Sequence, residues 1–550
     1  MPTISFKGKS FVQNHHLTVK YHELIPEPEK SLTDKVSLHD NLIIHGDNLK
    51  ALKALLPTYA GKIDCIYIDP PYNTGTEKWI YNDNVNSPMI REWLGKVVDR
   101  EDLSRHDKWL CMMMPRLKLL KELLSEDGVI FVSIDYNEIH HLTCLMNEIF
   151  GEENFRDAII IRRGVKNVQA QFDTIDSLSN GYESILVYTK QPSRRFNKVY
   201  EDVEEKPGSW NNHWRGTDRK TMRYELFGVT PTEGQWRWGK ERSLQAIENY
   251  QMMLDELRQK GITNPTQEDI DKWYLEYVEN NGEDIDLLRQ NDNGTIEHFV
   301  PPTSKKLLSN AWFDLKPNGS SQLKKIFGRK VFDNPKSIDL VKRLIQFATE
   351  NKEAIVLDSF AGSGTTAHAV LSLNKQDGGN RRFILIEMEE YAHEITAERV
   401  RRVIKGIPKA KDEELKQGLK GTFSFFRLGD PIEMEAILKG ENLPSYEDLA
   451  RYLFFTATGE LFDPSVVDYE HHFIGSSRDY DVFLFYKPDL DYLKTTALTL
   501  EKAEEIARIT IGSSKKRLVF APMKFLDQDY LDKYRIDFVQ LPYEIYRMKG

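Results

Sequence analysis

The chain has 550 residues, of which 40% are hydrophobic and 29% charged, and its formal net charge is −10. This composition is typical of an ordinary soluble globular protein, and a prior of about 150 residues per domain predicts three or four domains. Since no apolar run approaches the roughly 20 residues that cross a bilayer, no membrane span is expected, and the acidic balance alone does not indicate nucleic-acid binding.

Residues 1–40 are polar, show little periodicity and are predicted to form an N-terminal extension. The first residues lack the basic-then-apolar pattern of a secretion signal. The three cysteines of the chain are widely spaced and follow no metal-ligand pattern, so we expect no metal. These features predict a cytoplasmic protein.

Residues 41–190 alternate between short apolar runs and amphipathic stretches, which predicts alternating strands and helices. Continuous apolar runs of this kind are typical of strands that are buried on both faces of a parallel sheet. The expected strands lie within 41–48 and at 63–68, 128–135 and 184–189, and the expected helices at 49–56, 106–124 and 137–149. This alternation predicts part of a doubly wound α/β sheet.

The sheet pattern is interrupted by residues 191–330, which are irregular and rich in Trp, Arg, Asn and Gly, and it resumes in residues 331–425. Residues 426–550 have a third composition. The further expected helices are 338–348 and 366–374, and the further expected strands are 354–358, 382–387, 480–486 and 517–521. We therefore expect a Rossmann-like α/β core with an inserted domain and a smaller C-terminal α/β or α+β domain.

A glycine-rich segment follows the predicted strand that ends at Asp358. Gly362 and Gly364 allow a sharp turn and a close approach of the backbone to a ligand, and the next helix begins with free N–H groups. Glu387 ends the following strand, where an acid can hold ribose hydroxyls. The pattern indicates an adenosyl ligand, with a purely structural turn as the alternative. Since no Gly-Lys-Ser/Thr follows, nucleotide hydrolysis is disfavoured.

The tetrapeptide Asp69-Pro70-Pro71-Tyr72 follows the predicted strand 63–68, at the edge of the sheet where ligands bind in such folds. An aromatic amine is a poor nucleophile because its lone pair is delocalised into the ring. The Asp69 carboxylate and the Pro70 carbonyl can accept its two N–H groups, the prolines stiffen the turn, and Tyr72 offers a face for an extruded base. The alternative is a rigid strand-to-loop turn.

Two motifs carry a resemblance to amino-methyltransferases of DNA, namely Asp69-Pro70-Pro71-Tyr72 and Phe360-Ala361-Gly362-Ser363-Gly364. The order, with the catalytic motif before the cofactor motif, resembles the β class. Asp as the first residue, with Asn73-Thr74-Gly75 after Tyr72, resembles adenine-N6 enzymes, whereas cytosine-N4 enzymes more often begin with Ser. Cytosine-N4 and RNA adenine methylation stay open as alternatives.

Residues from about 40 to 405 are similar to the modification (Mod) subunits of Type III restriction–modification systems. The further matches are His45-Gly46-Asp47, Gly128–Asp135, Tyr182–Lys190, Gln235–Trp238 and Phe332–Ser337. The resemblance implies an S-adenosyl-L-methionine site and no requirement for a metal in methylation. Its expected residues are Asp47, Lys336, Ser337, Asp358, Phe360, Ala361, Gly362, Gly364 and Glu387. Lys336 and Ser337 would reach the methionine carboxylate, although many relatives have Pro after the Lys.

The insertion 191–330 is expected to recognise double-stranded DNA, because it interleaves aromatics with Arg, Asn and Gln. The alternative for Trp236 and Trp238 is that each belongs to the core of the insertion. The expected phosphate contacts are Arg219, Lys220, Arg223, Lys324, Lys325, Arg329 and Lys330.

Residues 426–550 show no nucleophile triad, helicase motif or metal cluster and are expected to serve dimerisation or partner docking. The resemblance implies a homodimer and a restriction (Res) subunit as partners. A competing hypothesis is a DNA-recognition or assembly subunit that turns over only with a partner.

Overall fold

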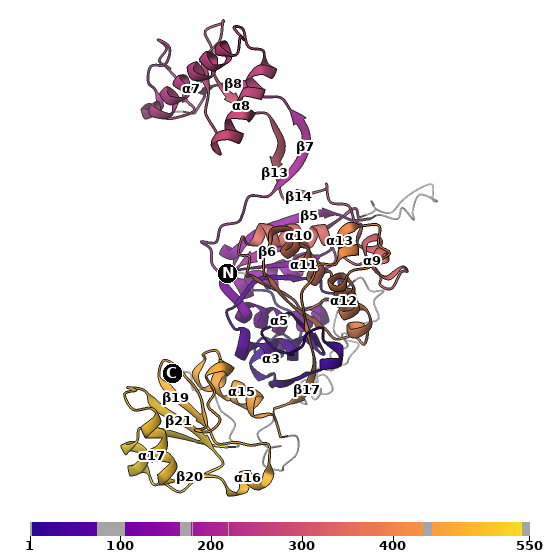
Figure 1. The fold of residues 1–550 in the computed structure, drawn as a ribbon, viewed down its shortest axis with the longest axis vertical. Coiled ribbons are helices and arrows are strands. Elements are labelled where there is room, and N and C mark those ends of the chain that lie inside the picture. Colours follow the sequence, from indigo (N-terminus) through magenta and orange to yellow (C-terminus); the bar gives the residue numbers. More distant parts are fainter. Residues whose placement is uncertain are drawn as a thin grey trace. The chain divides into compact units, whose positions relative to one another are not determined.

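The computed structural model describes residues 3–73, 105–164, 178, 180–217, 219–432 and 443–541. Figure 1 shows the chain as a ribbon coloured along the sequence. The chain forms two compact units. One unit consists of Met1–Asn197 with Ser309–Gly550, and the other is Lys198–Leu308.

A ten-stranded sheet forms the centre of the first unit, with helices packed against it (Figure 1). Its strands, in spatial order, are β1 (His22–Pro26), β17 (Ser424–Pro431), β2 (Leu42–His45), β16 (Arg382–Glu387), β15 (Ile355–Asp358), β3 (Ile63–Ile68), β4 (Leu124–Ile134), β6 (Tyr182–Thr189), β5 (Phe155–Arg162) and β14 (Ala311–Trp312). The helices include α3 (Asn48–Tyr59), α5 (Arg105–Leu123), α6 (Ile139–Phe150), α10 (Ile338–Ala348), α11 (Thr365–Asp377) and α12 (Glu398–Lys405). The expected α/β core is confirmed.

The strands from β17 to β4 run parallel to one another, and apolar residues fill both faces of this part of the sheet. Beyond β4 the direction changes, since β6 pairs antiparallel with both β4 and β5. The continuous apolar runs predicted strands of a parallel sheet, which is wrong for β6, because a buried strand has the same composition in either direction.

The bounds of the two structural units differ from the predicted domain bounds. The extension 1–40 contributes β1, which pairs antiparallel with β17 across the predicted boundary at 425. Residues 309–330 lie in the first unit, where β14 pairs with β5 and α9 (Gly319–Phe327) follows. The second unit, Lys198–Leu308, therefore contains fewer residues than the predicted insertion 191–330.

The second unit, Lys198–Leu308, has its own apolar core. The helices α7 (Lys240–Gln259) and α8 (Gln267–Asn281) pack on a small antiparallel sheet through residues such as Met253, Trp273 and Phe299. The strands are β8 (Ser209–Asn212), β11 (Leu288–Gln290) and β12 (Ile296–Val300) in that sheet, the pair β9 (Trp214–Arg215) and β10 (Gln235–Trp236), and the pair β7 (Tyr200–Lys206) and β13 (Thr303–Leu307).

The C-terminal part of the first unit has a second, smaller sheet whose strands β19, β21 and β23 are parallel and whose strand β18 is antiparallel. The strands are β18 (Phe473–Ser476), β19 (Tyr480–Leu484), β21 (Lys516–Ala521) and β23 (Ile536–Gln540), and the accompanying helices include α15 (Tyr446–Thr458) and α17 (Leu500–Ile509). This part is α/β, as expected. In the described ranges, every helix is too short or too polar to cross a membrane.

Candidate active site

The predicted site residues meet at one edge of the large sheet because their strands are parallel neighbours. Leu357 on β15 pairs with Ile66 on β3, and Glu387 on β16 pairs with His45 on β2. The carboxyl ends of these four strands therefore point to the same edge, where open α/β sheets bind their ligands. The tetrapeptide and the glycine-rich loop, which nearly 300 residues of sequence separate, come together there.

The glycine-rich loop has a conformation that requires glycine at two positions. Gly362 and Gly364 have φ angles of 51° and 76°, in the left-handed region. A Cβ on Gly362 would lie 3.2 Å from the Phe332 ring, and one on Gly364 would lie 3.2 Å from the Thr396 carbonyl oxygen. Gly364 is also the N-cap of α11, so the loop turns directly into a helix N-terminus.

Two buried acids hold this loop in place. The Gly362 N–H donates to Glu387 Oε2 at 2.7 Å, and the Phe360 N–H donates to Asp358 Oδ1 at 3.1 Å. Asp358 also accepts from the Thr366 hydroxyl at 2.5 Å. Burial raises the pKa of each acid to about 7. Both carboxyl groups therefore change protonation near neutral pH.

Arg399 on α12 is a further contact of the loop that the sequence did not reveal. Its Nη1 donates to the Ser363 carbonyl at 3.2 Å, the Ser363 hydroxyl at 2.9 Å and the Thr365 hydroxyl at 2.8 Å. The guanidinium is fully buried, and burial lowers its pKa to about 9. In the described part of the chain, its Nε and Nη2 have no hydrogen-bond partner. An arginine inside a charged helix carries no sequence pattern that would single it out.

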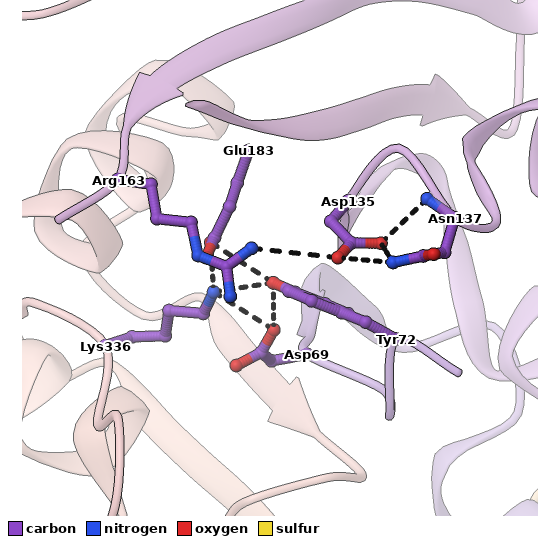
Figure 2. A network of polar contacts seen from close by, with 7 residues as sticks. All are labelled: Asp69, Tyr72, Asp135, Asn137, Arg163, Glu183 and Lys336. Carbon is purple, nitrogen blue, oxygen red and sulfur yellow. Dashed lines mark hydrogen bonds and ion pairs between the residues drawn. The ribbon is translucent and has the colours of Figure 1, made fainter. Parts of the chain in front are cut away.

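The tetrapeptide forms a compact polar cluster with two distant residues, shown in Figure 2. The Tyr72 hydroxyl donates to Asp69 Oδ1 at 2.7 Å. The Lys336 ammonium donates to the Tyr72 hydroxyl at 2.6 Å and to Glu183 Oε2 at 2.5 Å, and it lies 3.3 Å from Asp69 Oδ1. Glu183 was not among the predicted site residues. It lies in β6, for which the sequence predicted a strand at 184–189.

Burial and charge act in opposite directions on the pKa values of this cluster. Burial raises the pKa of Asp69, and the nearby Lys336 ammonium offsets only part of that shift. Burial favours the neutral forms of Glu183 and Lys336 as well. The surrounding charges together outweigh it, so Lys336 and Arg163 lower the pKa of Glu183, while Asp69 and Glu183 raise that of Lys336. Lys336 and Glu183 are therefore a charged pair beside Asp69.

A second group of residues supports this cluster from the side (Figure 2). Arg163 Nε lies 3.6 Å from Glu183 Oε1, and Arg163 Nη1 lies 3.7 Å from Asp135 Oδ2. Asp135, which is buried after β4, accepts from the Asn137 side chain at 2.9 Å. The cationic Arg163 thus links two acids from neighbouring strands.

The turn of the tetrapeptide is fixed by contacts with α5. The Pro71 carbonyl accepts from the buried Trp109 Nε1 at 2.7 Å, and Pro70 is itself buried. Asn73 is fully buried with a φ of 58°, and its side chain donates to the Arg105 carbonyl at 3.2 Å. Thr74 and Gly75 lie outside the described residues. These contacts hold both sides of the turn, next to its two prolines.

Three of the expected cofactor residues have other contacts. Lys336 points to Asp69 and Tyr72, although the sequence placed it on a methionine carboxylate. Ser337 is buried at the N-cap position of α10. Asp47 caps α3 by accepting from the Lys50 N–H at 3.1 Å. Phe360 and Ala361 are buried in the loop, where the Ala361 N–H donates to the Ile386 carbonyl at 3.1 Å.

Three tryptophans of the second unit, Trp214, Trp236 and Trp238, differ in how far they are buried. Trp236 is 4% exposed and its Nε1 donates to the Tyr224 carbonyl at 2.7 Å, which confirms the core interpretation for this residue. Trp238 packs beside that core, with the Arg242 guanidinium 4.5 Å from its ring. Trp214, directly opposite Trp236, is 41% exposed. It lines a surface pocket together with Asn212 and Trp236.

Comparison with known proteins identifies sequence relatives. The N6/N4 DNA methylase family profile matches residues 63–398. The EcoPI Mod subunit of a type III restriction-modification enzyme from Escherichia phage P1 is 30% identical over 472 residues, which cover 72% of this chain and 67% of that protein. The StyLTI Mod subunit from Salmonella typhimurium is 30% identical over 503 residues, covering 83% of this chain and 70% of that protein. The type II methyltransferase M.KpnI from Klebsiella pneumoniae is 32% identical over 382 residues, covering 65% and 82%.

Proposed function

Because this chain belongs to the N6/N4 DNA methylase family and is a DNA methyltransferase, we propose that it methylates the N6 amine of adenine in double-stranded DNA. One observation carries the proposal. The Lys336 ammonium lies among Asp69 Oδ1, the Tyr72 hydroxyl and Glu183 Oε2, so these oxygens already surround a nitrogen that donates several hydrogen bonds. An exocyclic amine also donates N–H hydrogen bonds, although it is neutral and has two N–H groups.

The residues of the glycine-rich loop fit S-adenosyl-L-methionine. The left-handed Gly362 and Gly364 let the loop turn sharply while it packs closely on Phe332 and Thr396, and Glu387 offers carboxylate oxygens to ribose hydroxyls at the end of β16. When bound, this group supplies an activated methyl group on a sulfonium. Asp358 and Arg399 would hold the loop around it, as they hold Phe360, Ser363 and Thr365 here.

The tetrapeptide would prepare the amine for transfer. In our proposal Asp69 Oδ1 accepts an N–H of the target amine and the Pro70 carbonyl accepts the other, which concentrates the lone pair on nitrogen. The Tyr72 hydroxyl, by donating to Asp69, orients that carboxylate. Of the contacts of Lys336, the one with Asp69 is the longest, so the amine can replace it while Lys336 stays on Glu183.

Methyl transfer to DNA by the purified chain tests this proposal. Labelled donor, duplex DNA and mass analysis of the nucleosides should give N6-methyladenine. Asp69→Ala should abolish transfer and leave donor binding within about twofold. Asp127→Ala removes an exposed acid at β4 and is the matched control. N4-methylcytosine as the product, or near wild-type transfer by Asp69→Ala, would overturn the proposal.

We also assign target recognition to the second unit, Lys198–Leu308, on the strength of its exposed Trp214 beside Asn212. Affinity for DNA should fall steeply with salt, since phosphate contacts dominate such binding. The C-terminal part is proposed to serve dimerisation and docking of a Res subunit, in a Type III Mod role in the cytoplasm. Light scattering of the purified chain tests the dimer, and transfer by the chain alone argues against a subunit that works only with a partner.

A further inference from the structure

A cluster of two histidines and one glutamate lies behind the tetrapeptide, outside the site described above. His106 is in the first turn of α5, Glu138 precedes α6, and His141 is in the first turn of α6. His106 Nδ1 lies 2.6 Å from Glu138 Oε1, and His141 Nδ1 lies 2.9 Å from Glu138 Oε2. One ligand atom from each residue can be chosen so that all lie within 4.8 Å of one another.

The hydrogen bonding of this cluster is incomplete. Glu138 is fully buried, and its Oε2 has no hydrogen-bond partner in the described ranges. The same holds for the buried Nδ1 of His141, so the 2.9 Å approach of these two atoms lacks the geometry of a hydrogen bond. A buried carboxylate oxygen without a partner is costly unless a cation compensates it.

The donor set is the one that zinc and similar first-row cations prefer. Two imidazole nitrogens and a carboxylate are a known zinc ligand set in which a water takes the fourth position, with bonds of about 2.0–2.2 Å. Such bonds place neighbouring ligand atoms roughly 3.3 Å apart in a tetrahedron. The imidazole rings of His106 and His141 already lie with centroids 4.6 Å apart, so small side-chain shifts would bring both Nδ1 atoms and Glu138 onto one ion.

We propose that His106, Glu138 and His141 bind a zinc-like divalent cation that fixes the back of the catalytic turn. The connection runs through Asn73, whose side-chain amide donates to Glu138 Oε1 and which directly follows Tyr72. The ion would join the start of α5 to the start of α6 and hold Asn73 in its left-handed conformation. This role is structural and does not involve the ion in methyl transfer.

Metal binding by the full chain tests this inference without any activity assay. After removal of metals with a chelator, calorimetric titration with Zn²⁺ should show one saturable site per chain. Co²⁺ should give a visible absorption band, and Zn²⁺ should displace it. His141→Ala should weaken Zn²⁺ binding by more than about 100-fold, since even loss of an outer-shell partner costs about 10–100-fold. The neighbouring His140 is exposed on α6, so His140→Ala should bind like the wild type.

Two further measurements keep the result interpretable. Thermal melts of each apo-protein show whether a variant is folded, and Zn²⁺ should raise the melting temperature of the wild type and His140→Ala but not of His141→Ala or Glu138→Gln. The inference is overturned if the folded wild type shows no saturable site for Zn²⁺ or Co²⁺, or if His140→Ala and His141→Ala lose binding equally. In that case the cluster is held by hydrogen bonds and protons alone.

Discussion

The ammonium of Lys336 lies closer to Glu183 than to Asp69, at 2.5 Å from Glu183 Oε2 and 3.3 Å from Asp69 Oδ1. Lys336 thus pairs with the Glu183 carboxylate. It also lowers the pKa of Asp69, which burial raises. The charge of Lys336 therefore affects the acid that is proposed to accept the target amine, even if the two separate during transfer.

Replacement of Lys336 should shift the pH dependence of methylation. In Lys336→Gln the pKa of Asp69 should rise by about one unit or more, because an adjacent cation lowers a carboxyl pKa by roughly 1–3 units. Since Asp69 acts as the carboxylate, the acidic limb of the rate profile should move to higher pH. Single-turnover rates between pH 5 and 9 measure this limb. Lys342→Gln, on α10 and bonded to Ser372, is the control and should leave the limb in place.

Glu387 should make stability depend on pH near neutrality. Burial raises its pKa from 4.5 to about 7, so the folded protein binds this proton more tightly than the unfolded chain does. The associated stability is fully present below pH 4.5 and is lost as pH rises through 7. Glu387→Gln cannot ionise, so its stability relative to the wild type should rise between pH 4.5 and 8 by on the order of 3 kcal/mol. Denaturant melts at each pH measure the difference.

The control for this prediction is Glu394→Gln, which removes a carboxyl group at an exposed position beyond the same strand. The prediction fails if the relative stability of Glu387→Gln does not change over this pH range, or if Glu394→Gln shows the same trend.

Gly364 and Gly378 separate the effect of backbone strain from the effect on the cofactor. They lie at the two ends of α11, with φ angles of 76° and 69°. Alanine at either position should cost about 1–2 kcal/mol of stability, because a Cβ disfavours the left-handed region. A Cβ at Gly364 also lies 3.2 Å from the Thr396 carbonyl oxygen, whereas one at Gly378 has no neighbour within 4 Å.

Gly364→Ala should therefore weaken S-adenosylmethionine binding by about tenfold or more, and Gly378→Ala should leave it unchanged. Calorimetric titration of the two variants, compared at equal folded fractions, measures the difference. Equal affinity in both variants would show that the loop does not hold the cofactor.

Trp214 and Trp236 offer a matched pair in the second unit, since they face each other across β9 and β10. Trp236→Ala should destabilise the unit by about 3–5 kcal/mol, as expected for a buried aromatic. Trp214→Ala, at an exposed position, should change stability by less than about 1 kcal/mol. If Trp214 stacks on a base, its loss should weaken DNA binding by about 1–3 kcal/mol, or roughly 5–150-fold. Fluorescence anisotropy on duplex DNA tests this.

Local patterns predicted the elements of this fold better than they predicted its contacts. The helix Ile338–Ala348 has the predicted bounds because its apolar residues repeat at helical spacing. The left-handed glycines of the loop also follow from local geometry. The meeting of Lys336 with Glu183 depends on the order of strands across the sheet, since β6 lies beyond β4 and runs antiparallel to it. No periodicity encodes that order.

The same reason explains why the sequence did not reveal the contacts of Arg399 or the cluster around Glu138. Each residue looks ordinary in its own segment, and its partners come from other segments that the fold brings together. His106 lies 32 residues before Glu138, so the three ligands of the proposed metal site form no local sequence motif, and the expectation of no metal rested on cysteine spacing and on the resemblance.

The first and last residues of the second unit lie close together in space, although they are far apart in the sequence. Its first and last strands, β7 and β13, pair antiparallel, and the Leu308 N–H donates to the Val199 carbonyl at 2.9 Å. The chain enters and leaves this unit through the paired strands β7 and β13. Recombination at the two short stretches of coding sequence for these strands can therefore exchange the whole unit. If this unit chooses the DNA sequence, a host could acquire a new specificity in one genetic event while its catalytic sheet is inherited unchanged.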